Sequence, residues 1–124
     1  YGIDRRTALK LSSSFGGGMG RLREVCGSVS GMFLTAGILY GYDSPKDRSS
    51  KTEHYKRIQE LARSFEELNG SIVCRELLGL DQKKESYVPE ERTKDYYRKR
   101  PCEQIVGCAA YIMEEYIRNH PILS

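Results

Sequence analysis

Residues 21–40 read RLREVCGSVSGMFLTAGILY and end in the most apolar stretch of this 124-residue chain. Apolar side chains recur there every three or four positions, which is the spacing of one face of an α-helix. From Val29 onward nearly every face is apolar, and such a helix is surrounded by others. The segment therefore predicts a central helix, with these recurring apolar residues: Leu22, Val25, Cys26, Val29, Met32, Phe33, Ala36 and Tyr40.

The residues before this segment predict a shorter helix and then a tight connection. Asp4 can cap the helix, and Ala8, Leu11 and Phe15 can share one of its faces. The helix is expected to stop at residues 16–20, GGGMG, because each glycine costs about 1 kcal/mol relative to alanine inside a helix.

Three further helices are predicted after the central one. A capping box at 50–53 opens a helix that ends at Asn69-Gly70. A short helix is expected over 71–80, and a last one runs from Pro101 to Asn119. Between them, residues 82–100 are polar and predict a surface loop. No segment alternates as a strand does, so we predict an all-α fold, a compact bundle of about four to five helices.

Composition and charge are those of one soluble domain over residues 1–124. With 39% hydrophobic and 30% charged residues, the chain is not collagen-like, of low complexity or membrane-spanning. The apolar stretch 31–40 is far shorter than the ~20 residues that cross a bilayer. A net charge of +3 is too small to indicate nucleic-acid binding. Because the chain begins with Tyr1, we expect a further N-terminal helix ahead of it.

Cysteine is the candidate reactive residue type. Thiolates are nucleophiles and soft metal ligands, and a helix N-terminus favours the anionic form. Cys74 and Cys102 fall in the first turns of predicted helices, and Cys26 in the glycine-rich opening of the central helix, so the three sulfurs can converge. Gly27 and Gly31, on one side of that helix, allow a backbone or a cofactor to approach closely. Four cysteines are too few for a disulfide scaffold, which favours a reducing compartment, the cytoplasm.

Other residues have competing interpretations. Cys108 lies about 120° around the last helix from the first cysteine of that helix and fits a packed core side chain. Arg21 and Arg23, beside the glycines, either hold an anion or form a solvated helix start. His54 and His120 are predicted to be surface histidines. The glycines lack the spacing of a nucleotide loop, and there is no Cys-x-x-Cys.

Several blocks of the sequence resemble the C_GCAxxG_C_C family, small bacterial and archaeal proteins described as redox-active. Residues 15–21 look like its glycine-rich block, and residues 24–31 like its Cys-Gly-Ala-x-x-Gly signature, with Ser28 in place of the alanine. Residues 70–79 and 102–110 look like its third and fourth cysteine segments. The family's first cysteine belongs to a helix that precedes the first block.

The resemblance implies a redox function for Cys26, Cys74 and Cys102, which match the family's other three cysteines. In the leading hypothesis these residues and a fourth ligand hold an iron–sulfur cluster for electron transfer, with Gly27 and Gly31 beside it. A similar helical domain occurs in split-Soret cytochromes, but the Cys-x-x-Cys-His haem attachment is absent here, so no haem is expected.

Two alternatives stay open. The first is metal-free thiol–disulfide exchange, in which Cys74 attacks and Cys26 or Cys102 resolves the mixed disulfide. The second is a non-enzymatic interaction module with structural cysteines, such as a homodimer that buries the apolar central helix. The sequence does not identify a redox partner protein.

Overall fold

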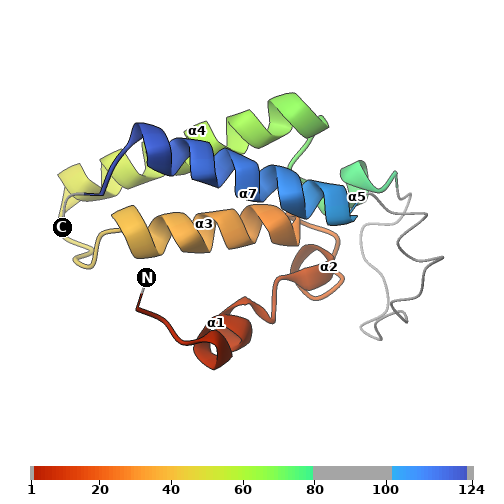
Figure 1. Ribbon diagram of the computed structural model, residues 1–124, viewed down its shortest axis with the longest axis horizontal. Helices are drawn as coiled ribbons and strands as arrows, with labels where there is room; N and C mark the ends of the chain where they lie inside the picture. Colours follow the sequence, from red (N-terminus) through yellow and green to blue (C-terminus); the bar gives the residue numbers. More distant parts are fainter. Residues whose placement is uncertain (1, 80–101, 123–124) are drawn as a thin grey trace.

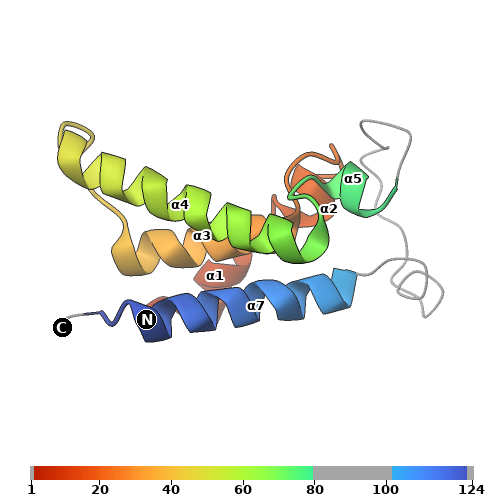
Figure 2. The same cartoon turned by 90° about the horizontal axis from the view of Figure 1, so that it is seen from above.

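The computed structural model describes residues 2–79 and 102–122, and in that part of the chain the regular structure is helical. Three long helices, α3 (Gly27–Tyr40), α4 (Arg48–Asn69) and α7 (Cys102–Asn119), each contact the other two (Figures 1 and 2). The predicted all-α bundle is confirmed. The predicted loop at 82–100, together with Leu80 and Pro101, lies outside the described residues. None of the described helices is both long and apolar enough to span a membrane.

Three short helices pack at the edges of this bundle. α1 (Arg5–Ser12) contacts α3, and α2 (Gly16–Met19) contacts both α3 and α5 (Cys74–Leu77). α3 and α7 both begin at the end of the bundle where α2 and α5 lie, and α4 ends there (Figure 1). Helix beginnings far apart in sequence are therefore gathered at one end.

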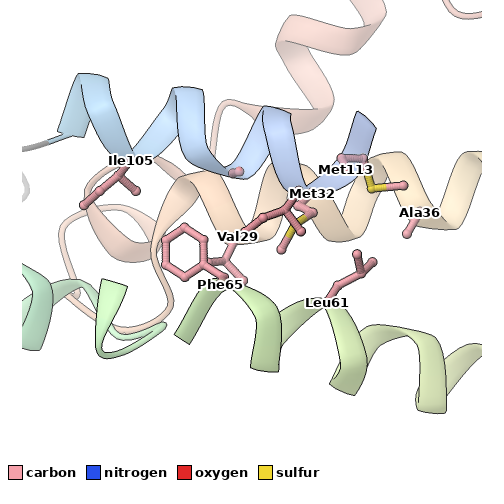
Figure 3. Close-up of a cluster of buried hydrophobic side chains, with 9 residues drawn as sticks. Val29, Met32, Ala36, Leu61, Phe65, Ile105 and Met113 are labelled. Atoms are coloured by element: carbon pink, nitrogen blue, oxygen red, sulfur yellow. The ribbon is translucent and has the colours of Figure 1, made fainter. Parts of the chain in front are cut away.

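The hydrophobic core lies between the three long helices. Val29 of α3 and Phe65 of α4 are completely buried, and Figure 3 shows them close together. The central position predicted for the apolar segment is confirmed, because α3 contacts α1, α2, α4 and α7. Its outer face is not covered everywhere, since Ile38 is 48% exposed. The core consists of Val29, Met32, Ala36, Leu61, Phe65, Ile105, Ala109, Ile112 and Met113.

The predicted beginning of the central helix is wrong by six residues. Helix α3 starts at Gly27, and Arg21 and Arg23 have left-handed φ angles of 69° and 59°. The backbone of this segment pairs with a distant one instead: Val25 forms an antiparallel bridge with Val73. Long-range hydrogen bonding has overridden the local apolar periodicity.

The predicted beginning of the third helix is also wrong. The cap is Asp47, whose carboxylate accepts hydrogen bonds from the Ser50 backbone N–H at 3.1 Å and from the Ser50 hydroxyl at 2.7 Å. Helix α4 therefore starts at Arg48, earlier than the capping box at 50–53 predicted. Its end is confirmed, because Gly70 is the C-cap with a φ of 92°.

The first helix is capped as predicted, and it lies at the surface. Asp4 accepts a hydrogen bond from the Thr7 N–H at 2.7 Å. None of the residues of α1 is buried, and Leu11, on the apolar face of this helix, is 54% exposed.

The prediction of a surface histidine is wrong for His54. Its side chain is only 9% exposed, and its Nδ1 lies 3.1 Å from a guanidinium nitrogen of Arg57. The Tyr42 ring approaches edge-on. Burial, and then the positive charge of Arg57, lower the pKa of His54 below its ordinary 6.5. His120 is exposed, as predicted.

This histidine gives the stability a pH dependence. Because its pKa is lower in the folded state, the unfolded chain binds the extra proton more readily. We expect the contribution of His54 to the free energy of unfolding to be greatest above pH 6.5. This contribution should fall as the pH drops from 6.5 through the lowered pKa of the folded state. Urea unfolding from about pH 7 to about pH 5 measures this slope. His54→Gln should flatten it, His120→Gln should not, and a flat wild-type curve would contradict the prediction.

Candidate functional site

A left-handed turn of the backbone leads into the candidate site. Gly17 and Gly18, inside α2, both have φ angles of 69°, and Gly20 has a φ of 62°. Hydrogen bonds hold the turn, from the Met19 N–H to the Phe15 carbonyl at 3.1 Å and from the Gly20 N–H to the Gly16 carbonyl at 2.9 Å. This conformation costs a residue with a side chain about 1–2 kcal/mol, whereas glycine adopts it without that cost. The predicted tight connection is thus confirmed, and it is built from left-handed residues.

A short antiparallel pairing then brings two of the candidate cysteines together. Next to the Val25–Val73 bridge, the Cys26 N–H donates to the Ile72 carbonyl at 2.8 Å, and the Cys74 N–H donates to the Glu24 carbonyl. Side chains alternate along extended backbone, so Cys26 and Cys74 lie on the same side of the pairing. These backbone hydrogen bonds bring together two cysteines that lie 48 positions apart in the sequence.

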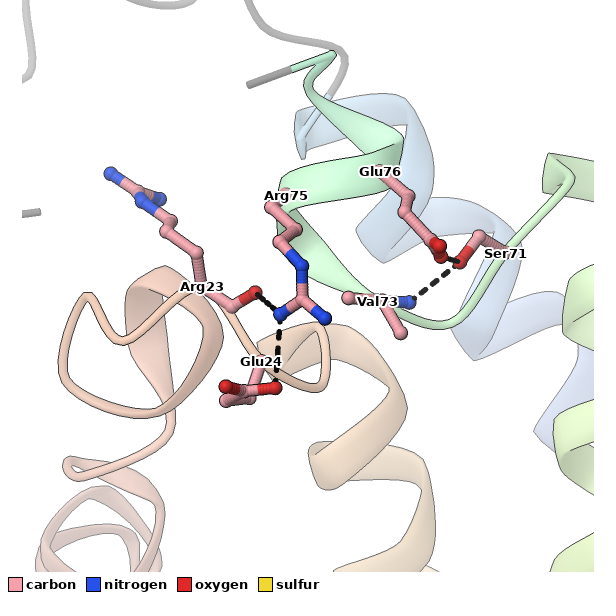
Figure 4. A network of polar contacts seen from close by, with 6 residues as sticks. All are labelled: Arg23, Glu24, Ser71, Val73, Arg75 and Glu76. Carbon is pink, nitrogen blue, oxygen red and sulfur yellow. Dashed lines mark hydrogen bonds and ion pairs between the residues drawn. The ribbon is translucent and has the colours of Figure 1, made fainter. Parts of the chain in front are cut away.

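Arg75 fastens the pairing from the outside. Its guanidinium donates to the Arg23 carbonyl at 3.2 Å and forms an ion pair with the Glu24 carboxylate at 3.0 Å (Figure 4). Nearby, the Ser71 hydroxyl hydrogen-bonds to Glu76 and accepts from the Val73 N–H at 2.9 Å. These contacts fix the loop before α5 against the segment before α3.

Gly18 fixes the position of Cys74. A Cβ atom at Gly18 would lie 2.5 Å from the Cys74 Cβ and 2.8 Å from the Arg23 Cα, distances that real Cβ atoms do not adopt. The left-handed turn therefore presses directly against the cysteine. A side chain at this position would displace Cys74, Arg23 or both.

All three predicted cysteines line one cavity. Cys26 caps α3, while Cys74 and Cys102 are the first residues of α5 and α7. The cavity has a volume of about 320 Å³ and is partly open to solvent. Cys74 is buried, and the other two thiols are half-buried. The structure thus places the three predicted residues around one cavity, two of them at the first position of a helix and the third at an N-cap.

Arg23 also lines this cavity, and the sequence left its role open between holding an anion and forming a solvated helix start. Its side chain is 1% exposed, which is inconsistent with a solvated helix start. It lines the cavity, and its NH1 donates to the Cys74 Sγ at 3.5 Å. Figure 4 shows the guanidinium directed away from Arg75 and Glu24. The signal in the sequence was a charged residue three positions before the signature cysteine, next to the glycines.

The other predicted residues divide between the cavity and its surroundings. Gly27 lines the cavity, and the Phe15 carbonyl oxygen occupies the space that its side chain would need, 2.8 Å from an ideal Cβ. Gly31 is different: apart from its chain neighbours and the backbone of its own helix, no described atom lies within 4 Å of an ideal Cβ there, so no other described segment approaches it closely. Cys108 packs against the core and accepts a hydrogen bond from Asn69 Nδ2 at 3.4 Å.

None of the four cysteines takes part in a disulfide. In the described ranges, no three His, Cys, Asp or Glu side chains lie close enough together to hold a metal ion. What the arrangement offers is a set of soft sulfur donors and nucleophiles around a cavity that also contains a buried cation.

The fold and the site together define an all-α protein with three cysteines around one cavity. Cysteine thiolates are the side chains that take part in thiol redox reactions. The chain belongs to the C_GCAxxG_C_C family, whose model matches residues 1–116. The family is described as "Putative redox-active protein (C_GCAxxG_C_C)". The resemblance seen in the sequence is thereby confirmed. No curated protein and no solved structure matches the chain.

Proposed function

We propose that the cavity is a redox centre for electron transfer, in which Cys26, Cys74 and Cys102 ligate an iron–sulfur cluster. One observation carries this proposal: three cysteines from three separate segments, none of them in a disulfide, line the same cavity of about 320 Å³. The description of the family as redox-active supports a redox role for these cysteines.

The donor set fits such a group. Thiolates are the usual ligands of iron–sulfur clusters, and they bind different iron atoms, so they need not surround a single point. A cluster with its thiolates is anionic, and the Arg23 guanidinium at the Cys74 sulfur supplies a compensating charge. When bound, the cluster would supply reversible one-electron transfer. The protein's part is to hold it and to limit its contact with water.

The test is cluster reconstitution with single cysteine variants. The protein is incubated anaerobically with ferrous iron and sulfide, and iron content, visible absorbance and EPR spectra are measured. We expect Cys26→Ser, Cys74→Ser and Cys102→Ser each to lose most of the bound iron. Cys108→Ser is the matched control and should keep it, because this thiol bonds to Asn69 and does not line the cavity.

Two results would count against the cluster. One is a colourless wild-type protein that retains no iron. The other is equal iron binding by the wild type and by a variant that lacks the three cavity cysteines. If all four cysteines can be replaced without loss of fold or of partner binding, the domain is an interaction module with structural cysteines.

A second candidate, thiol–disulfide exchange, is favoured by the contact between Arg23 and Cys74. A guanidinium 3.5 Å from a sulfur attracts negative charge on that sulfur. The Cys74 thiolate would attack one sulfur of a substrate disulfide, forming a mixed disulfide and releasing one thiolate. Cys26, on the same side of the pairing, would then attack the Cys74 sulfur and release the second thiolate. The substrate gains two electrons, and a Cys26–Cys74 disulfide forms.

Peptide mapping after oxidation separates the two candidates. Thiol exchange predicts a Cys26–Cys74 or Cys74–Cys102 disulfide, formed without metal and reversed by a dithiol reductant. Both candidates need reduced thiols, so we also propose that the protein works in a reducing compartment such as the cytoplasm.

A further inference from the structure

Arg75 holds the backbone of Arg23 by two hydrogen bonds. The Arg75 backbone N–H donates to the Arg23 carbonyl at 3.3 Å, and the Arg75 guanidinium donates to the same oxygen at 3.2 Å. The same guanidinium nitrogen lies 3.0 Å from the Glu24 carboxylate. Arg23 has a left-handed φ of 59°, a conformation that persists only where the surroundings hold it. Arg75 is therefore one of the residues that keep this strained backbone in place.

The position of the Arg23 backbone decides what the Arg23 side chain can reach. That side chain is 1% exposed, and its NH1 donates to the Cys74 Sγ at 3.5 Å. Arg75 does not line the cavity, and Figure 4 shows its guanidinium directed at the Arg23 carbonyl and the Glu24 carboxylate. Any effect of the Arg75 side chain on the Cys74 sulfur is therefore transmitted by the residues that it holds.

We propose that Arg75 is a positioning residue for Cys74: it holds the Arg23 backbone so that the Arg23 guanidinium meets the Cys74 sulfur. A cation beside a thiol favours the thiolate, which is the nucleophile and the metal ligand. Arg75 thus increases the reactivity of Cys74 without touching its sulfur. This inference deepens the proposed function and rests on it in one respect, that Cys74 is a reactive sulfur of the redox centre.

The exposure of the ion pair separates a positioning role from a structural one. The side chains of Arg75 and Glu24 are 27% and 51% exposed, and ion pairs this exposed contribute little to stability. We therefore expect the loss of the Arg75 side chain to change the reactivity of Cys74 much more than it changes the urea concentration at which the protein unfolds.

The rate of alkylation by iodoacetamide at each cysteine tests the proposal. The sulfur forms a bond to carbon while the carbon–iodine bond breaks, iodide leaves and the thiol proton goes to the buffer. Rates are measured by mass spectrometry at neutral pH on the reduced, metal-free protein, and the rate at Cys74 is divided by the rate at Cys108. Cys108 is a suitable internal reference because it bonds to Asn69 and does not line the cavity.

We expect Arg75→Gln to lower this relative rate by about threefold to tenfold, which is the effect of one or two hydrogen bonds on an equilibrium. Arg75→Lys keeps a donor and a positive charge, and it should retain most of the wild-type rate. Arg118→Gln is the matched control. It removes an exposed arginine of α7 that forms an ion pair with Glu115 at 2.8 Å, and it should leave the rate at Cys74 unchanged.

A double variant shows whether Arg75 acts through Arg23. Arg23→Gln alone should lower the relative rate at Cys74, and adding Arg75→Gln should then lower it no further. Residues that act independently have additive effects. A further fall by the same factor, or no effect of Arg23→Gln alone, would therefore overturn the proposal.

Four other results would also overturn it: no reaction of Cys74 in the wild type, an unchanged rate in Arg75→Gln, a faster rate in that variant, or a large loss of stability together with the slower rate. If Arg75→Gln does not fold, Glu24→Gln removes only the ion pair; it should slow Cys74 by about twofold, and an unchanged rate would decide against the proposal. A slower rate without cluster formation would reject only the cluster, and a cluster with an unchanged rate would reject only the positioning role.

Discussion

Gly18→Ala is expected to lower the free energy of unfolding by about 3 kcal/mol or more, since it combines left-handed strain with overpacking. The new Cβ would lie 2.5 Å from the Cys74 Cβ, 2.8 Å from the Arg23 Cα and 2.9 Å from the Glu24 backbone nitrogen. Two of these atoms belong to the backbone, and the third is the first side-chain carbon of a buried residue. None of them can move aside by a simple rotation of a side chain.

The matched control is Gly31→Ala. Gly31 lies within α3, and apart from its chain neighbours and the backbone of that helix, no described atom lies within 4 Å of its ideal Cβ. Alanine should therefore stabilise the protein there by about 0.5–1 kcal/mol. Urea unfolding of both variants, followed by circular dichroism, measures the difference. Equal effects at the two glycines would show that Gly18 is not packed against Cys74 and Arg23.

Phe65→Ala should have an effect of similar or greater size, about 3–5 kcal/mol, because it leaves a cavity in the middle of the core. Phe65 is completely buried on α4, in the cluster that includes Val29 of α3 and Ile105 of α7. The bundle is small, so this is a large part of its total stability.

Leu68→Ala is the control on the same helix. Leu68 is 64% exposed, and its truncation should change the free energy of unfolding by less than about 0.5 kcal/mol. Chemical unfolding monitored by circular dichroism compares the two variants. Similar losses for both would place the core elsewhere on α4.

The sequence was a good guide to which segments are helices and a poorer guide to their packing. In α4, apolar residues recur every three or four positions, and Tyr55, Leu61, Phe65 and Leu68 are among them. Leu61 and Phe65 are buried, whereas Tyr55 and Leu68 are 52% and 64% exposed. Periodicity indicates which face turns inward but not how far the neighbours extend. Helix α4 has 22 residues, or about 33 Å, while α3 has 14, or about 21 Å. Parts of the longer helix have less of α3 to cover them.

The candidate site was predictable only in part for a related reason. The position of the cysteines at helix beginnings suggested that Cys26, Cys74 and Cys102 share one site, and all three line one cavity. The burial of Arg23 was not predictable, because it depends on the pairing of residues 23–26 with residues 72–75, about fifty positions away. Local periodicity extended the helix through Leu22, and that residue is 48% exposed at the surface.

Three residues with side chains have left-handed backbones between the end of α2 and the start of α3: Met19, the last residue of α2, and Arg21 and Arg23 in the following loop, with φ angles of 69°, 69° and 59°. Glycine adopts this conformation at no steric cost, whereas a residue with a side chain does not. These three residues therefore make the segment less stable than it would be with glycine at the same positions. Selection for stability alone would replace these side chains with glycine. Selection for function would retain the strained and buried Arg23. The most stable relative of this protein is therefore not expected to be the most active one.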